Sequence, residues 1–336
     1  MSAAIEIAGL SKQYSVGFWR KRPRIALQPL HMEVQRGEVF GYLGHNGAGK
    51  TTTLKLLMGL IFPTAGSARV LNLDIGDPAM KERIGFLPEQ PYFYDYLTAP
   101  ELLTYFAQLS GINAGNRERR VRTALIRVGL RGIDRLQLRK FSKGMLQRVG
   151  LAQAILHDPE VVILDEPMSG LDPIGRREVR DLIQSLKDDG KTILFSTHIL
   201  SDAESLCDRV AVLQKGRLRV VGRVSELTAS VQGRMEVTWR DAPAEALGGL
   251  AVENRAGGDC IRSVVLEAEL DAALQALRRA RGRLISVTPI RRSLEQYFLE
   301  QGDTETNLGR DNEPRLQFQT SETPPFDTER IAELAK

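Results

Sequence analysis

The chain has 336 residues, of which 42% are hydrophobic, and a formal net charge of +4. This length predicts two domains with real cores, and the charge is too small to indicate nucleic-acid binding, so no nucleic-acid partner is expected. No apolar run reaches the ~18 residues that a membrane-spanning helix needs, and the first residues lack the features of a secretion signal, so a cytoplasmic protein is expected.

The first predicted element is a strand over 5–10, and Tyr14 is expected on the loop that follows it. An exposed ring there could stack on a purine face, a contact worth ~1–3 kcal/mol by analogy with base stacking on aromatic side chains. A plain surface tyrosine is the alternative. Only the motifs further along the chain favour the stacking role.

A glycine-rich stretch follows the apolar run 38–43 and precedes a helical pattern from residue 54. Its spacing is that of the P-loop, in which successive backbone N–H groups surround a phosphate chain. Lys50 can bridge the β- and γ-phosphates, and the Thr51 hydroxyl can hold Mg²⁺. The stretch predicts a nucleoside triphosphate site made by Gly44, Asn46, Gly47, Ala48, Gly49, Lys50, Thr51 and Thr52.

Four aromatic residues stand close together in the segment 92–96, in a chain that is only 6% aromatic. Tyrosines on a loop suit a docking surface because their hydroxyls need water or a partner, although core packing is the other possibility. Helical periodicity then replaces strand patterns from residue 99 to about 157, which predicts an all-helical insertion. Ser142 is a good N-cap for the last helix of this insertion.

The apolar run 161–164 ends in Asp165 and Glu166, as expected of a central parallel strand that delivers carboxylates to its C-terminal edge. Asp165 suits Mg²⁺ bound through water, and Glu166 suits polarising an attacking water. Two acids at the start of a surface turn are the alternative, which leaves the buried strand before them unexplained. His198 leaves the end of the next predicted strand, so a contact with the γ-phosphate is expected.

Beyond residue 224 the pattern changes to short strands and a helical stripe, which predicts a small α+β domain over 226–302. Its expected strands and helices cover 234–239, 261–266, 270–277, 284–287 and 293–299. From residue 303 polar, proline and acidic residues dominate, so a flexible tail is expected over 303–336, with a short helix at 329–334.

In this order and spacing, the motifs make residues 1 to about 225 resemble the ATPase subunit of an ABC transporter. The resemblance implies an α/β fold, a P-loop NTPase cassette with a mostly parallel sheet, an antiparallel β subdomain and a helical subdomain at about 99–157. It names ATP as the nucleotide and Mg²⁺ as its metal. It also assigns Glu166 to catalysis and His198 to the γ-phosphate.

In that family two cassettes face each other head to tail, and each ATP lies between one P-loop and the partner's signature helix. The resemblance therefore implies that Ser142 and Gly144 bind the nucleotide of the second subunit. It counts Asp172 among the nucleotide-binding residues and assigns it to communication across the dimer. It assigns Tyr14 to adenine stacking.

Two departures from the family pattern bear on the direction of transport. The signature reads Ser-Lys-Gly-Met, with Lys143 and Met145 in place of a small residue and an amide. The loop that usually offers a glutamine to Mg²⁺ reads Pro-Glu-Gln, so Glu89 or Gln90 can fill that position. Both variants are similar to those of bacterial exporter ATPases of the drug, antibiotic or polysaccharide type, which also carry a small C-terminal domain.

The function implied by the resemblance is ATP hydrolysis that powers export of a substrate through a separate transmembrane permease. A second ATPase subunit, expected to be an identical copy, completes the pair on the inner face of the cytoplasmic membrane. A soluble ABC ATPase acting on nucleic acid or the ribosome is the alternative, but it would need a long coiled coil, a zinc module or tandem cassettes. A GTPase would need an Asn-Lys-x-Asp motif, which we do not find.

Overall fold

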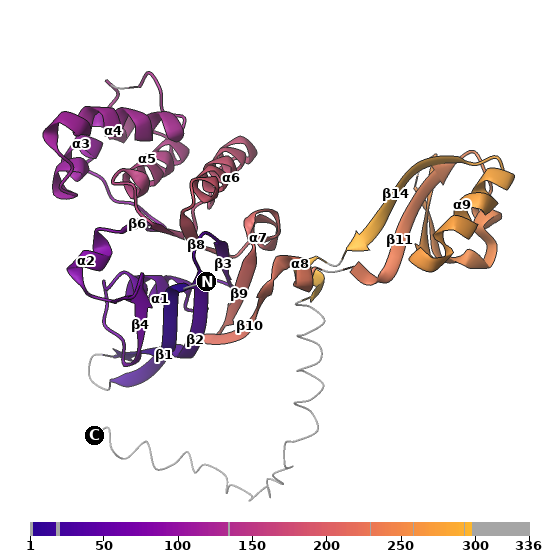
Figure 1. Ribbon diagram of the computed structural model, residues 1–336, viewed down its shortest axis with the longest axis horizontal. Helices are drawn as coiled ribbons and strands as arrows, with labels where there is room; N and C mark the ends of the chain where they lie inside the picture. Colours follow the sequence, from indigo (N-terminus) through magenta and orange to yellow (C-terminus); the bar gives the residue numbers. More distant parts are fainter. Residues whose placement is uncertain are drawn as a thin grey trace, which may run out of the picture. The chain divides into compact units, whose positions relative to one another are not determined.

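The computed structural model describes residues 3–297, apart from 18–20, 134, 229, 258 and 292 (Figure 1). The tail expected over 303–336, with its short helix, lies outside these residues. Within the described chain the strands form three sheets. The first two belong to the segment that carries the P-loop, and the third is built by residues beyond 229.

A six-stranded sheet in the order β10-β9-β3-β8-β7-β6 carries the nucleotide-binding motifs. Its strands are Val39–Leu43 (β3), Ile84–Leu87 (β6), Val161–Asp165 (β7), Thr192–Thr197 (β8), Arg209–Gln214 (β9) and Arg217–Arg223 (β10). All neighbours pair in parallel except β9 and β10, which form the expected hairpin with its turn at Lys215 and Gly216. Every residue of β3, β7 and β8 is buried, as in parallel strands that are covered on both faces.

A second, antiparallel sheet has the order β2-β1-β4-β5, with strands Ala3–Val16 (β1), Arg22–Gln35 (β2), Ala65–Val70 (β4) and Leu73–Asp74 (β5). Strand β1 is longer than expected and pairs Tyr14 with Arg24 of β2, so the expectation that Tyr14 lies on a loop is wrong. The alternation of apolar residues fades after Leu10, but pairing with β2 continues through several register shifts. Cross-strand hydrogen bonds, which the local pattern does not reveal, extend this strand.

Helix α1 (Lys50–Leu57) joins the two sheets into one core. Its buried leucines share a single hydrophobic cluster with Ile5 and Val70 of the antiparallel sheet and with Phe40 and Ile163 of the parallel sheet. A short helix α2 (Pro78–Lys81) leads into β6. The P-loop therefore precedes a helix that is held on both sides by buried apolar surface.

The helices expected between 99 and 157 are present as one group in Figure 1. They are Ala99–Leu109 (α3), Ala114–Arg127 (α4), a 3₁₀ turn at Leu138–Lys140 (η1) and Lys143–Ile155 (α5). Helix α3 begins with a capping box between Thr98 and Glu101, and α5 begins at Ser142 as its N-cap. Three further helices follow, at Pro173–Asp188 (α6), Leu200–Leu206 (α7) and Val224–Leu227 (α8).

The third sheet has the order β12-β13-β11-β14 and its own core around Trp239, which is fully buried. Its elements are Ser230–Arg240 (β11), Ala244–Leu250 (η2), Ala251–Gly257 (β12), Cys260–Leu266 (β13), Glu267–Glu269 (η3), Leu270–Arg279 (α9) and Arg283–Arg291 (β14). Strand β12 is not among the expected strands. Of the helix expected over 293–299, residues 294–297 are helical, residue 293 is not, and residues 298 and 299 lie outside the described residues.

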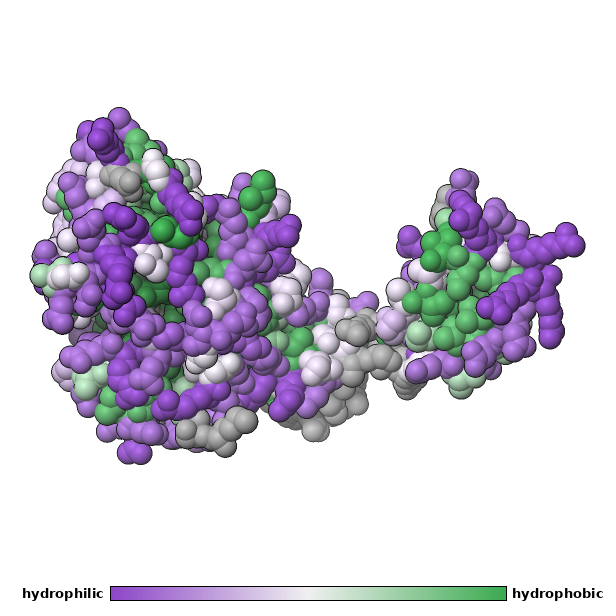
Figure 2. Space-filling view, turned by 45° about the horizontal axis from the view of Figure 1, so that its top comes forward, coloured by the Kyte–Doolittle hydropathy of each residue, from purple (hydrophilic) through white to green (hydrophobic). Residues whose placement is uncertain are grey.

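Within the described residues, the helices are all too short or too polar to cross a bilayer. Hydrophilic side chains cover most of the face shown in Figure 2. The domain boundaries at 225 and 302 stay a prediction.

Replacing Gly85 of β6 by alanine is expected to destabilise the cassette. A Cβ there would lie 1.9 Å from the carbonyl oxygen of Ala154, on the helix α5 that packs against this strand. Relieving such overpacking costs about 1–3 kcal/mol, which lowers the thermal unfolding midpoint by several degrees. Gly115→Ala in α4 is the control, because a Cβ there meets no atom within 4 Å, and its midpoint should be unchanged or slightly higher. Equal midpoints for Gly85→Ala and the wild type would contradict the close packing of α5 on β6.

Candidate functional site

The P-loop connects β3 to α1 and is closely backed on one side. Gly47 and Gly49 have φ angles of +79° and +109°, in the region that favours glycine. A Cβ on Gly49 would lie 2.6 Å from the carbonyl oxygen of Ala26, and one on Gly44 would lie 2.5 Å from that of Leu213. A Cβ on Gly47 would meet no atom within 4 Å. Strands β2 and β9 thus support the loop from behind, while its tip is open.

Hydrogen bonds hold this loop in place from two directions. Gly216, in the β9–β10 turn, donates its N–H to the carbonyl of Ala48 over 2.8 Å. Beneath the loop, the Thr53 hydroxyl donates to the Gly49 carbonyl over 3.1 Å, which leaves it to accept from the buried Tyr42 hydroxyl, also at 3.1 Å. Burial raises the pKa of Tyr42, so its hydroxyl keeps the proton that it donates.

A cavity of about 540 Å³ opens over the P-loop, within the size range of ligand sites. The expected site residues that line it are Tyr14, Asn46, Gly47, Gly49, Lys50, Thr51, Thr52, Glu89 and Glu166. Helix α1 begins at this cavity with Gly49 as its N-cap and no side-chain cap, so its first N–H groups can serve an anion. The triphosphate of ATP fits this site, which offers glycines with positive φ angles, a helix N-terminus without a side-chain cap, and the ammonium of Lys50.

The two acids stand at the end of β7, where Asp165 is almost fully buried. Glu166 lies between two nitrogen donors. Its Oε2 accepts from Nδ1 of His198 over 2.9 Å, and its Oε1 is 3.1 Å from Nζ of Lys50. The Oε1 atom is buried and forms an ion pair with the Lys50 ammonium, which also donates to the Gly44 carbonyl at 2.5 Å. Both carboxylate oxygens of Glu166 are therefore held beside the P-loop by nitrogen groups, one by Lys50 and the other by His198.

Ser142, Gly144 and Asp172 do not reach this cavity. They line a second one, of about 350 Å³, together with Gly170 and residues of the helical insertion. Ser142 caps α5 by accepting from Met145 N–H over 3.2 Å, and Asp172 caps α6 by accepting from Gly175 N–H over 2.8 Å. The structure brings the signature residues together with Asp172, apart from the P-loop of the same chain.

Oxygen donors suited to Mg²⁺ are available near the phosphate loop. Mg²⁺ prefers hydroxyl, carboxylate, carbonyl and water oxygens, which Thr51, Asp165, Glu89 and Gln90 can supply. Glu89 lines the nucleotide cavity, whereas Gln90 is exposed and is not among its lining residues. Of the four, Thr51 and Glu89 line the cavity, and their hydroxyl and carboxylate oxygens are of the types that Mg²⁺ binds.

Several cavity residues escaped the sequence analysis. Val16, Arg24, Ile25, Ala26 and His45 complete the lining, four of them from the β1–β2 hairpin. The positions of these four follow from the pairing of Tyr14 with Arg24, which no sequence motif predicts. His45 stands inside the P-loop pattern at a position where any residue is allowed.

Ser196 on β8 is another residue that sequence reasoning missed. It is fully buried and hydrogen-bonds to both Asp165 and Glu166. The only hint in the sequence was its place at the end of the strand that leads to His198.

Residues 27–169 match a family described as ABC transporter. An uncharacterized ABC transporter ATP-binding protein of Synechocystis is 46% identical over 299 residues, covering 88% of this chain and 84% of that protein. The bacitracin transport ATP-binding protein BcrA of Bacillus licheniformis is 42% identical over 221 residues, 65% of this chain and 69% of that protein. Among solved structures, an ATP-binding subunit of an ABC transporter shares 32% identity with a TM-score of 0.59, covering 67% of this chain and 91% of that one.

The resemblance drawn from the motifs is confirmed by these comparisons, and the α/β cassette fold is confirmed as well. The 46% identity extends over most of both chains, so it includes more than the P-loop region. The chain therefore belongs to the ABC transporter family of ATP-binding proteins and is an ATP hydrolase of that family.

Proposed function

We propose that this chain hydrolyses ATP with Mg²⁺ and drives export of a substrate through a separate transmembrane permease. The observation that carries the proposal is the placement of Glu166 at the cavity, with its carboxylate between Lys50 and His198. A glutamate carboxylate placed there can orient an attacking water and accept its proton. Lys50, 3.1 Å away, supplies positive charge where the γ-phosphate would be bound.

The other site residues have separate roles in this proposal. Tyr14 stacks on the adenine, and the backbone from Gly44 to Thr52 surrounds the phosphates, with His198 at the γ-phosphate. Thr51, Asp165 and either Glu89 or Gln90 would hold Mg²⁺, which neutralises charge on the phosphate oxygens. We assign these roles to an ATPase domain at 1–225, followed by an α+β domain at 226–302 and a tail at 303–336.

A second copy of the chain completes each site. Ser142, Gly144 and Asp172 gather in a cavity that does not include the P-loop, which supports a head-to-tail pair in which they serve the partner's nucleotide. Each subunit then contributes half of two equivalent sites. ATP stabilises the closed pair through contacts that its hydrolysis removes, and this difference supplies the conformational bias.

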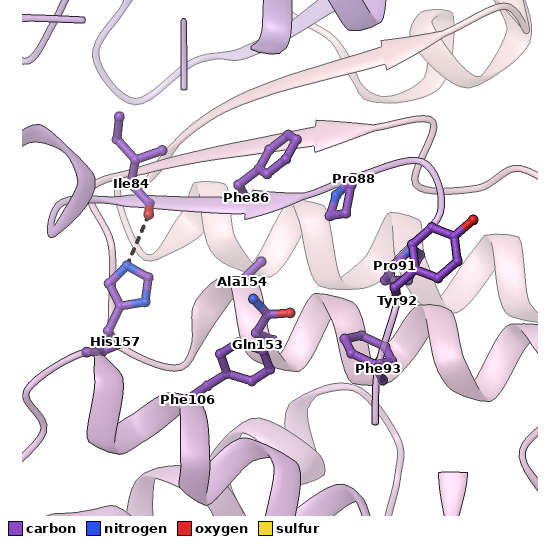
Figure 3. A pocket seen from close by; sticks show the side chains of 11 residues that line it. Ile84, Phe86, Pro88, Pro91, Tyr92, Phe93, Phe106, Gln153, Ala154 and His157 are labelled. Carbon is purple, nitrogen blue, oxygen red and sulfur yellow. Dashed lines mark hydrogen bonds between the residues drawn. The ribbon is translucent and has the colours of Figure 1, made fainter. Parts of the chain in front are cut away.

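A third cavity, of about 330 Å³, suits the permease (Figure 3). It lies between β6, the loop that follows it, α3 and α5, and its lining includes no Asp, Glu, Lys or Arg. Burial lowers the pKa of His157, whose Nε2 donates to the Ile84 carbonyl, so this ring is neutral at pH 7. Such a lining suits the apolar face of a helix, as in helix-in-groove recognition.

The aromatic segment 92–96 borders this third cavity, which we call the docking pocket. Tyr92 and Phe93 line it, and the Tyr92 side chain is 90% exposed. Tyr94 and Tyr96 are also exposed but contact each other, with ring centroids 6.0 Å apart, and they do not line the pocket. Docking of a permease helix here would hold the chain on the inner face of the cytoplasmic membrane.

Two observations support export over import. The relatives include proteins named for bacitracin transport, and the Ser-Lys-Gly-Met signature is similar to that of exporter ATPases. The structure adds that Lys143 lies against Gly170, so the lysine is part of the surface around the signature.

Glu166→Gln should keep ATP binding and nearly abolish turnover, because the amide preserves the shape of the site but cannot accept a proton from water. The variant should also accumulate as an ATP-bound dimer in size-exclusion chromatography. Steady-state hydrolysis and retained nucleotide are the measurements, with the wild type as reference. A purified variant that hydrolyses ATP at the wild-type rate would refute the role of Glu166.

If two chains pair head to tail, mixing two different inactive variants should restore one active site in each mixed dimer. In a mixture of Ser142→Arg and Lys50→Ala chains, each mixed dimer carries both changes in one site and leaves the other site intact. The mixture should therefore hydrolyse more ATP than either variant alone. If its rate matches the mean of the two separate variants, Ser142 acts within its own chain.

Alanine at Tyr92 or Phe93 should uncouple the cassette from its permease. Loss of a hot-spot ring reduces the free energy of binding to the permease by roughly 2 kcal/mol or more, which weakens the affinity about 30-fold. The contacts to the nucleotide are not changed. Co-purification with the permease should fall, and ATPase activity of the isolated cassette should not. Phe62→Ala is the control, since this ring is 82% exposed and does not line the pocket. Normal coupling in both test variants would place the docking surface elsewhere.

A further inference from the structure

Ser196 lies beside both acids of the motif, Asp165 and Glu166. It lies on β8 directly opposite Asp165 in the parallel register with β7, and it is fully buried. Its Oγ donates to Oδ1 of Asp165 over 2.6 Å and accepts the backbone N–H of Glu166 over 2.9 Å. One hydroxyl therefore bonds to both acids of the motif.

The first of these bonds orients the Asp165 carboxylate. A serine hydroxyl has one proton, and this one is committed to Oδ1 over a distance typical of a charge-assisted hydrogen bond. With Oδ1 held, the carboxylate plane is fixed, and so is the direction of its second oxygen. Asp165 is the last residue of a buried strand, so it has little freedom to find another orientation.

The second bond stabilises an unusual backbone conformation. Glu166 has a φ angle of +50°, in the left-handed region that residues with a Cβ rarely occupy. Its N–H points to Ser196 Oγ in this conformation, and its side chain meets Lys50 and His198. A strained residue persists only where its surroundings compensate for the strain, and the hydroxyl of Ser196 is one such compensation.

We propose that Ser196 is a positioning residue for hydrolysis, which sets the direction of the Asp165 carboxylate and holds the turn that presents Glu166 to the cavity. This inference rests on the proposed roles of those two acids. It adds a specific claim, that the hydroxyl of Ser196 controls metal-dependent steps and leaves the binding of metal-free nucleotide to the P-loop.

The test is Ser196→Ala in the full chain, with Ser263→Ala as a matched control. Ser263 is also fully buried, and its hydroxyl also makes two bonds, donating to Asn254 Oδ1 at 2.5 Å and accepting from Trp239 Nε1 at 3.2 Å. It lies in the C-terminal β sheet and not in the cassette. Both variants lose a buried hydroxyl, so a general loss of stability appears in both.

Three quantities separate positioning from structure: kcat, the affinity for a fluorescent non-hydrolysable ATP analogue in EDTA, and the same affinity with Mg²⁺. For Ser196→Ala we expect binding in EDTA within twofold of the wild type, a smaller gain in affinity on adding Mg²⁺, and a kcat lower by roughly ten- to a hundredfold. Ser263→Ala should match the wild type in all three. Thermal unfolding midpoints show whether both variants are folded.

Ser196→Thr gives a second, conservative arm. Threonine keeps a hydroxyl on Cβ, so it should restore most of the kcat and the Mg²⁺ effect. A folded threonine variant as slow as the alanine variant would show that the hydroxyl is not the cause. If Ser196→Ala does not fold, the kcat and Mg²⁺ effect of Ser196→Thr still test whether the hydroxyl positions the two acids.

The inference is overturned if Ser196→Ala keeps a wild-type kcat and the full Mg²⁺ effect while Glu166→Gln is inactive; the proposed function then stands. It is also overturned if Ser196→Ala weakens binding in EDTA as much as binding with Mg²⁺, because Ser196 would then support the P-loop. A wild-type rate for Glu166→Gln would remove the proposed function together with this inference.

Discussion

The parallel pairing of β8 with β3 on one side and β7 on the other is the constraint on which the site depends. These three strands are fully buried, so their register is set by the core. Their C-terminal ends meet at one edge, where β3 leads to the P-loop, β7 to the two acids and β8 to His198. A shift of one residue between β7 and β8 would move Ser196 away from Asp165, and a shift in either pairing would separate Glu166 from Lys50. The chemistry therefore relies on apolar packing several residues away from it.

Much of this could be predicted from the sequence, because the relevant signals are local. The P-loop spacing specifies its own conformation through glycine, and the buried strand before Asp165 implies a parallel sheet with polar groups at its edge. Ser142 was recognisable because N-caps need short polar side chains, and Asp172 was assigned through the family resemblance. Gathering them in a cavity apart from the P-loop required the structure.

The features that the sequence analysis got wrong or did not find have one physical origin, which is pairing between segments distant in the sequence. Tyr14 was expected on a loop because its neighbours lack alternation, but the β1–β2 pairing extends the strand past it. Strand β12 reads as polar because it is an edge strand with exposed side chains, and only its pairing with β13 defines it. The role proposed for Ser196 depends on Asp165, which lies opposite to it on the neighbouring strand. Local periodicity carries no information about such partners.

The backing of the P-loop affects how substitutions in it should be interpreted. Gly44 and Gly49 pack so closely on the carbonyls of Leu213 and Ala26 that any side chain there would push two strands away, whether or not a nucleotide is bound. Inactivity in such variants therefore reports a damaged scaffold as readily as a lost phosphate contact. Gly47 faces open space, so a residue that tolerates a positive φ, such as asparagine, could be placed there without a steric clash. Among these three glycines, it offers the cleanest genetic separation of ligand recognition from loop architecture.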